Sequence, residues 1–191
     1  WNAAELGRAM GLSDKTMRYY LDILTGTFMI RLLQPWHENI GKRQVKAPKI
    51  YFRDSGILHK LLSLPDDHSL LGHPRVGASW EGFALEQTLQ IVKPPQAFFW
   101  STYSGAELDL LFTVQGRRYG MEFKFNEAPT VTKSMRIALD TLHLDHLWII
   151  YPGRQQYPAH DKISVLPLRD LAAIRDQLRK GKLWTAMKNS V

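Results

Sequence analysis

Three charged residues lie inside a stretch that otherwise has the pattern of a β-hairpin, and their types and spacing suit phosphodiester chemistry. Residues 105–125 (GAELDLLFTVQGRRYGMEFKF) hold Asp109, Glu122 and Lys124 among apolar side chains. Mg²⁺ prefers hard oxygen ligands, typically one or two carboxylates together with waters and a phosphate oxygen. An ammonium beside them can hold an attacking water and stabilise charge that develops on a phosphate. The three residues therefore predict a metal-dependent phosphodiesterase centre that uses Mg²⁺ or Mn²⁺.

The register of this hairpin decides which of the charges meet. A two-residue loop at Gln115 and Gly116 sets Asp109 opposite Glu122, whereas a four-residue loop sets Asp109 opposite Lys124. Side chains that are paired across two strands lie about 5 Å apart. Two carboxylates at that distance repel each other unless positive charge lies between them, so Lys124 and a divalent cation are the expected partners.

Strict alternation of faces is expected along both strands of the hairpin. One face would carry the large apolar residues, and the other would carry the three charges. The first strand divides into Leu108, Leu110, Phe112 and Val114 on one face, and Glu107, Asp109, Leu111 and Thr113 on the other. The second strand divides into Tyr119, Met121, Phe123 and Phe125 against Gly120, Glu122 and Lys124.

A further acid lies on the helix predicted before these strands. Glu81 shares a helical stripe with Leu85, Leu89 and Val92, which is expected to face the sheet. A carboxylate in such a place costs free energy unless it is paired or bound to a metal, so Glu81 is a third candidate metal ligand. Glu86 lies off that stripe and is expected at the surface.

The elements that must position these residues follow an α-β-β-β-α-β order from residue 79 onward. This order predicts a mixed sheet with helices on both faces, an α/β (α+β) domain over residues 79–170. An edge strand is expected at residues 163–168, and a surface helix with a tail over residues 171–191. Residues 61–78 mix Pro, Gly, Asp and His without a period and are predicted to be a linker.

Residues 1–60 have the pattern of a helix-turn-helix followed by a β-ribbon with a basic tip, a winged helix-turn-helix. A first helix ends near Met10, Gly11 makes the turn, and Ser13 is placed to cap the second helix. The second helix is expected to bury a stripe made of Met17, Tyr20, Leu21 and Leu24.

In winged helices the second helix and the wing commonly contact DNA, with basic side chains neutralising phosphates. The candidate nucleic-acid contacts are Lys15, Thr16 and Arg18 on the helix, and Lys42, Arg43, Lys46 and Lys49 in the ribbon. The alternative is that this unit only packs against its neighbours and that the exposed lysines are ordinary solubilising charge.

Composition favours a polyanionic partner. Lys and Arg number 25 against 18 Asp and Glu, which makes the formal net charge +7 and the pI about 9.7. The chain has no cysteine, which excludes disulfides and thiolate zinc sites. No apolar run of about 18 residues and no signal peptide occur, so a cytoplasmic protein without a membrane partner is expected. Because the chain starts at Trp1 within a helical pattern, an upstream domain is expected.

The four site residues resemble the motif of the PD-(D/E)XK nuclease superfamily, whose restriction-endonuclease-like core has the same αβββαβ order. Glu81 matches the acid on the helix, Asp109 the acid on one strand, and Glu122-Phe123-Lys124 the triplet on the next. The proline that usually precedes the aspartate is replaced by Leu108. The resemblance implies that Glu81, Asp109 and Glu122 bind metal and that Lys124 assists catalysis.

Nearly the whole chain resembles the C-terminal domain of unknown function carried by many prokaryotic AAA-type ATPases. The similar segments include KTMRYYLDIL, SWEGFALEQ and FFWSTYSGAELDLLF. A typical succession of residues is also present, namely Pro35-Trp36, Asn39, Lys42-Arg43, Pro48-Lys49, Tyr51-Phe52, Asp54, Gly56 and Ile57. The resemblance implies an upstream ATPase domain that would bind ATP, because no phosphate-binding loop of the Gly-x-x-x-x-Gly-Lys-Ser/Thr type occurs here.

The leading hypothesis is therefore a metal-dependent nuclease domain with a winged helix-turn-helix, the C-terminal part of an ATPase that acts on DNA. A non-catalytic DNA-binding or partner-docking module with the same fold is the alternative. A purely structural oligomerisation domain is a third hypothesis.

Overall fold

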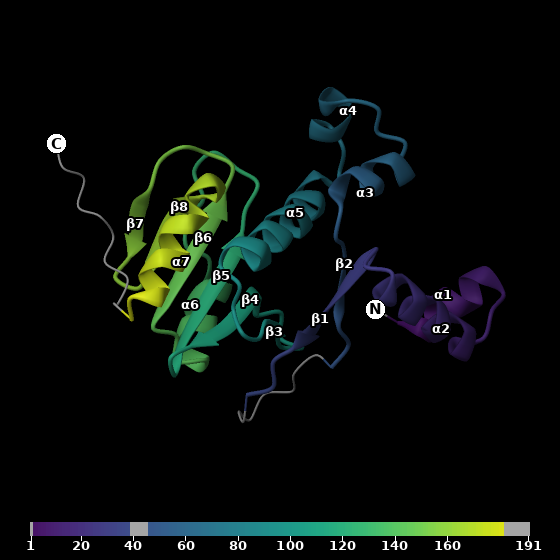
Figure 1. The fold of residues 1–191 in the computed structure, drawn as a ribbon, viewed down its shortest axis with the longest axis horizontal. Helices are drawn as coiled ribbons and strands as arrows, with labels where there is room; N and C mark the ends of the chain where they lie inside the picture. Colours follow the sequence, from purple (N-terminus) through teal and green to yellow (C-terminus); the bar gives the residue numbers. More distant parts are fainter. Residues whose placement is uncertain (1, 39–45, 182–191) are drawn as a thin grey trace.

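The computed structural model describes residues 2–38 and 46–181. Over this part of the chain it is a mixed α/β fold with an eight-stranded mixed sheet and seven α-helices (Figure 1). The strands are β1 (Ile30–Pro35), β2 (Lys49–Phe52), β3 (Phe98–Ser101), β4 (Glu107–Val114), β5 (Arg117–Phe123), β6 (His146–Tyr151), β7 (Tyr157–His160) and β8 (Ile163–Pro167). The helices are α1 (Ala3–Met10), α2 (Asp14–Gly26), α3 (Ser55–Leu61), α4 (Asp67–Leu71), α5 (Val76–Ile91), α6 (Lys133–Thr141) and α7 (Leu171–Arg179).

The first two helices form where the capping residues predict them. Gly11 ends α1 in the left-handed region at φ 67°, which glycine adopts without strain. Ser13 caps α2 by accepting a hydrogen bond from the backbone N–H of Thr16 at 3.1 Å. The predicted buried stripe of α2 is only partly correct. Met17 is buried, but Tyr20 and Leu24 are 46% and 42% exposed, because α1 is the helix that packs on α2 and it covers the Met17 side.

The β1–β2 ribbon is part of the main sheet. β1 pairs antiparallel with β2, setting Arg31 opposite Tyr51, and pairs in parallel with β3, setting Gln34 opposite Phe98. The strand order is β2-β1-β3-β4-β5-β6-β8-β7, which makes β2 one edge of the sheet. The ribbon expected to be a wing therefore extends the sheet that carries the candidate site.

The hairpin of β4 and β5 has the two-residue loop, and the four-residue alternative is wrong. Gln115 and Gly116 have φ values of 51° and 75°, the left-handed pair typical of a tight type I′ hairpin turn. The register runs from Val114 opposite Arg117 to Leu110 opposite Met121. Asp109 is consequently brought beside Glu122.

The prediction of strict alternation along β4 is wrong at its start. Leu108 packs with Leu111 and α6 on one side of the sheet, whereas Leu110 packs with α5 and α7 on the other. The cause is a β-bulge, because β4 advances from Leu108 to Leu111 while β3 advances only from Trp100 to Phe98. A bulge re-aims the side chains of the residues it contains, and Asp109 lies within this one.

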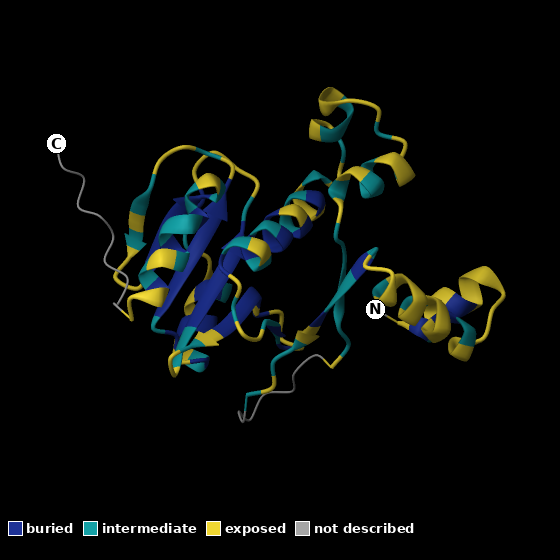
Figure 2. Ribbon diagram, in the orientation of Figure 1, coloured by how far each residue is buried: buried dark blue, intermediate teal, exposed yellow. Residues whose placement is uncertain are grey.

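Helices cover both faces of the sheet, as predicted. α5 and α7 pack on the face that carries Leu110 and Trp148, and α6 packs on the face that carries Leu111 and Ile149. Figure 2 shows the buried residues concentrated in β4, β5, β6, β8 and α5, with many exposed residues on α1, α2 and α4. The site therefore rests on the most completely packed part of the molecule.

Two expectations about the C-terminal part need correction. The strand at Ile163–Pro167 is not an edge strand, because β8 lies between β6 and β7. α7 buries Leu171, Ile174 and Leu178 in the core, so it forms part of a helical layer.

Within residues 61–78, predicted as a linker, α4 and the first residues of α5 are helical. No helix in the described ranges is long and apolar enough to cross a membrane.

Candidate active site

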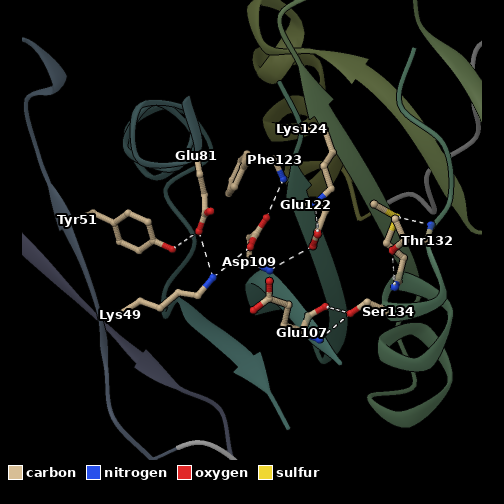
Figure 3. Close-up of polar contacts among 11 residues, drawn as sticks. Lys49, Tyr51, Glu81, Glu107, Asp109, Glu122, Phe123, Lys124, Thr132 and Ser134 are labelled. Carbon is tan, nitrogen blue, oxygen red and sulfur yellow. Dashed lines mark hydrogen bonds and ion pairs between the residues drawn. The ribbon is translucent and has the colours of Figure 1, made fainter. Parts of the chain in front are cut away.

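Asp109 and Glu122 lie together at the centre of the candidate site (Figure 3), as the hairpin register predicts. Their residues are only 4% and 3% exposed. The backbone N–H of Asp109 donates to Glu122 Oε2 at 3.4 Å, and the backbone N–H of Phe123 donates to Asp109 Oδ2 at 3.0 Å. Each carboxylate is thus held by the backbone of the other strand, which fixes its position relative to the sheet.

Lys124 follows Glu122 at the end of β5 and points back to it. Its Nζ donates to Glu122 Oε1 at 2.7 Å, and its side chain is 35% exposed. The backbone N–H of Lys124 donates to the carbonyl of Ile150 at 3.0 Å, which anchors this residue beside β6. The ammonium is therefore positioned next to the acids and remains reachable from solvent.

Glu81 lies on the side of α5 that faces the site, as its stripe predicts, and it contacts Asp109 through a shared partner. Glu81 Oε1 accepts hydrogen bonds from Lys49 Nζ at 3.1 Å and from the Tyr51 hydroxyl at 2.5 Å. The same Lys49 Nζ donates to Asp109 Oδ1 at 3.2 Å. The three acids expected at the site thus gather around two ammonium groups, that of the expected Lys124 and that of Lys49 from β2.

Lys49 was expected in the ribbon as a phosphate contact, and Tyr51 was not expected at the site. The structure places both on β2, two residues apart, with their side chains directed at Glu81 (Figure 3). The Lys-x-Tyr spacing on a strand was the available signal, because residues i and i+2 share a face. This spacing does not indicate which helix the shared face of the strand would contact.

Burial and mutual repulsion dominate the electrostatics of the two central acids. Burial, reinforced by the charge of Asp109, raises the pKa of Glu122 to about 8, and Lys124 only partly opposes this. Burial and the charge of Glu81 likewise raise the pKa of Asp109, against the opposing effect of Lys49. The protein therefore stabilises negative charge here incompletely, and an added cation would be favourable.

The pKa values of Lys49 and Tyr51 on β2 are raised as well. Burial alone would lower the pKa of Lys49, but the charges of Asp109 and Glu81 outweigh it and raise that pKa. Burial and Glu81 raise the pKa of Tyr51. Lys49 is consequently charged, and Tyr51 keeps its proton as a hydrogen-bond donor, near neutral pH.

The donor set suits Mg²⁺ or Mn²⁺ in chemical type. Within the part of the chain that the structure describes, no group of three or more His, Cys, Asp or Glu side chains is arranged to hold a metal ion. The carboxylates occur instead as pairs, Asp109 with Glu122 and Asp109 with Glu81, linked through backbone or Lys49. Mg²⁺ commonly binds through one or two carboxylates and keeps several waters, so a pair is sufficient.

An open cavity adjoins the site on the α5 side. It has a volume of about 500 Å³, and Lys49, Tyr51 and Glu81 are among its lining residues. A molecule that enters this cavity can therefore contact Lys49, Tyr51 and Glu81.

The predicted nucleic-acid contacts are only partly brought together. Lys15 and Arg18 are exposed on α2, and Thr16 takes part in the cap with Ser13. Arg18 and Lys46 line the same hollow of about 780 Å³. Lys42 and Arg43 lie outside the described residues.

Comparison with known families places this site within a recognised domain. Residues 76–171, about half of the chain, match the family described as Domain of unknown function (DUF4143). The chain belongs to the DUF4143 family. Glu81, Asp109, Glu122 and Lys124 all fall inside the DUF4143 match. Residues 1–68, which include Lys49 and Tyr51, match a second description, Domain of unknown function (DUF8612).

Similar proteins occur in mycobacteria. An uncharacterized protein of Mycobacterium tuberculosis and one of Mycobacterium bovis are each 45% identical to this DUF4143 chain over 167 residues, or 87% of its length. The chain spans 38% of the length of these relatives. No solved structure matches it.

Proposed function

We propose that this DUF4143 chain is a nuclease-like domain that binds DNA and hydrolyses phosphodiester bonds with Mg²⁺ or Mn²⁺. One observation carries this proposal. Asp109, Glu122 and Lys124 come together at the end of the β4–β5 hairpin that lies away from its turn, and Glu81 approaches them from α5. The α5-β3-β4-β5-α6-β6 order supports a restriction-endonuclease-like fold for this part.

The roles of the side chains follow from their positions. Asp109 and Glu122 would hold the cation with Glu81 assisting, and a bound divalent cation lowers the pKa of its water and polarises a phosphoryl group. The backbone N–H of Phe123 keeps Asp109 oriented. Lys124, fixed by Glu122, can orient an attacking water and stabilise charge developing on the phosphate.

The N-terminal part supports DNA binding. The net charge of +7 favours a polyanion, and the α1–α2 unit with its following ribbon is proposed to act as a winged helix-turn-helix. Exposed Lys15, Arg18 and Lys46 are the candidate phosphate contacts in the described residues. By its resemblance, the domain is proposed to form the C-terminal part of an AAA-type ATPase in the cytoplasm.

A non-catalytic DNA-binding or docking module is the second candidate, and one observation favours it. Lys49 already lies between Glu81 and Asp109, as a cation does in a purely structural ion-pair network. In that case Lys49, Glu81 and Asp109 hold the ribbon against the domain, and the domain does not cleave DNA.

The deciding experiment measures cleavage of single- and double-stranded DNA by the purified chain with Mg²⁺, Mn²⁺ or EDTA. Asp109→Ala and Lys124→Ala should each lower cleavage by about 100-fold or more, since each removes an interaction that acts in the transition state. Glu127→Gln changes an exposed acid outside the site and serves as the matched control. Salt-sensitive DNA binding without any cleavage would support the second candidate, and absence of DNA binding at low salt would contradict both.

A further inference from the structure

We propose that Lys49 is a positioning residue that occupies the place of the divalent cation between Glu81 and Asp109 and leaves it when that cation binds. The inference rests on the proposed function, because the cation is the one that function requires. It assigns part of the control of the site to the ribbon, which lies in the segment that precedes the DUF4143 match.

The geometry around Lys49 is that of a single cation shared by two acids. Its Nζ lies 3.1 Å from Glu81 Oε1 and 3.2 Å from Asp109 Oδ1. The two acids come from different elements, α5 and β4, and would repel each other without a positive charge between them. The Tyr51 hydroxyl binds the same Glu81 oxygen, which orients that carboxylate toward Lys49.

A divalent cation that binds both of these acids competes with Lys49 for Asp109 Oδ1, because Asp109 Oδ2 already accepts a hydrogen bond from the Phe123 N–H. Mg²⁺ is compact and uses one or two carboxylates, so it needs the same place. An ammonium on a flexible four-carbon stem is a point charge, and its departure would break the two ion pairs and a cation–π contact 5.6 Å from the centre of the Phe99 ring. Positive charge between the acids is thus maintained, and it rises from one unit to two, as the divalent cation replaces the ammonium.

The surroundings of Lys49 allow this movement. Lys49 begins β2, the edge strand of the sheet, and its side chain is 25% exposed. It lines the cavity of about 500 Å³, which offers the ammonium a solvated position a short distance away. The displaced amine would remain next to the site, where it can bind a phosphate of the substrate.

The consequence is that β2 influences cation affinity. Any movement of the ribbon that withdraws Lys49 frees Glu81 and Asp109 for a divalent cation. A rearrangement of the helices joined to this ribbon would therefore be communicated to the site through Lys49 and Tyr51.

Calorimetric titration of Mn²⁺ into the full chain tests the displacement. Lys49→Met removes the competing charge and keeps the length of the side chain, so Mn²⁺ should bind about tenfold more tightly or better. Lys49→Arg keeps the competitor, and Lys46→Met removes an exposed charge from the same segment, so both should stay within about threefold of wild type. Equal or weaker Mn²⁺ binding by a Lys49→Met variant with the wild-type unfolding midpoint would overturn the proposal, as would a wild-type chain that binds no Mn²⁺.

A second measurement needs no variant, so it decides the matter even if Lys49→Met does not fold. The wild-type chain is acetylated with a limiting amount of acetic anhydride, with and without Mn²⁺, and Lys49 and Lys46 are quantified by mass spectrometry. Mn²⁺ should raise the labelling of Lys49 several-fold relative to Lys46, because the released amine loses its two carboxylate partners. Unchanged labelling under conditions in which calorimetry shows bound Mn²⁺ would contradict displacement.

These readouts separate this inference from the proposed function. Release of Lys49 on Mn²⁺ binding without DNA cleavage would support the inference and refute the nuclease. Mn²⁺-dependent cleavage with Lys49 still protected would support the nuclease and refute the inference.

Discussion

Helix α5 contributes an acid to each of two charged clusters, and the two clusters are built on opposite balances of charge. Near its middle, Glu86 is paired with Arg31 of β1 and with Arg53, which directly follows β2. One turn and a half earlier, Glu81 belongs to the candidate site, where three carboxyl groups share two ammonium groups. Both clusters join α5 to the same ribbon, but only the first has more positive than negative groups.

The Glu86 cluster has the features of a structural ion pair. Arg31 binds both oxygens of the carboxylate, with Nη2 at 3.0 Å from Oε2, and the Glu86 side chain is only 5% exposed. A planar guanidinium in this two-point contact has little freedom to leave. The expectation that Glu86 is a surface residue is therefore wrong, since the ribbon that covers it arrives from a distant part of the sequence.

The difference teaches how to separate a structural from a functional cluster. The acid that the protein fully compensates holds the ribbon in place. At the candidate site, lysines on flexible stems compensate the negative charge of the acids only incompletely. A bound cation would therefore be favourable there.

The largest expected effect in this comparison is on stability. Glu86→Gln removes the carboxylate that two arginines share and should lower the free energy of unfolding by about 3 kcal/mol. Glu81→Gln removes one acid from the cluster with surplus acids and should change it by less than about 1 kcal/mol. Urea unfolding of both variants measures the two changes in the free energy of unfolding. Equal losses would show that the two clusters do the same structural work.

A pH titration of stability in EDTA should show a second difference. The pKa of Glu122 is about 8 in the folded chain against 4.5 as its ordinary value, so the folded state binds this proton more tightly than the unfolded state does. Its contribution to stability is therefore full below pH 4.5 and is lost as the pH rises toward 8. Glu122→Gln should lack this loss. If the stability of wild type and variant depended on pH in the same way, the inference that the charge of Glu122 is incompletely compensated would be contradicted.

The smallest effect is expected from Asp109→Asn. The amide oxygen can still accept the hydrogen bond from the Phe123 N–H, while the buried negative charge disappears. Stability should therefore stay unchanged or rise by about 1 kcal/mol, although cleavage is lost. Thermal unfolding and the cleavage assay, carried out on the same variant, check that stability and cleavage respond differently. A loss of several kcal/mol would place Asp109 with Glu86 as a structural acid.

Much of the local structure follows from short-range patterns. The capping residues and Gly11 locate α1 and α2. The α-β-β-β-α-β order predicted from residue 79 onward is confirmed, with its first helix beginning at Val76. The two-residue turn at Gln115 and Gly116 sets the register that brings Asp109 to Glu122. Such features depend on neighbouring residues, so the sequence alone allows them to be predicted.

Features that depend on distant partners were not predictable in the same way. The bulge that moves Leu108 to the α6 face arises from pairing with β3, and the exposure of Tyr20 depends on which helix covers α2. The burial of Glu86 depends on arginines more than 30 residues away in the sequence.

The sequence by itself determined the chemistry available at the site, namely three acids and a lysine on one helix and one hairpin. Only the tertiary structure decided that β2 joins the same sheet and directs Lys49 and Tyr51 at Glu81. The physical reason is that hairpin register is set by a local turn, whereas the meeting of an edge strand with a helix depends on how the whole sheet is assembled.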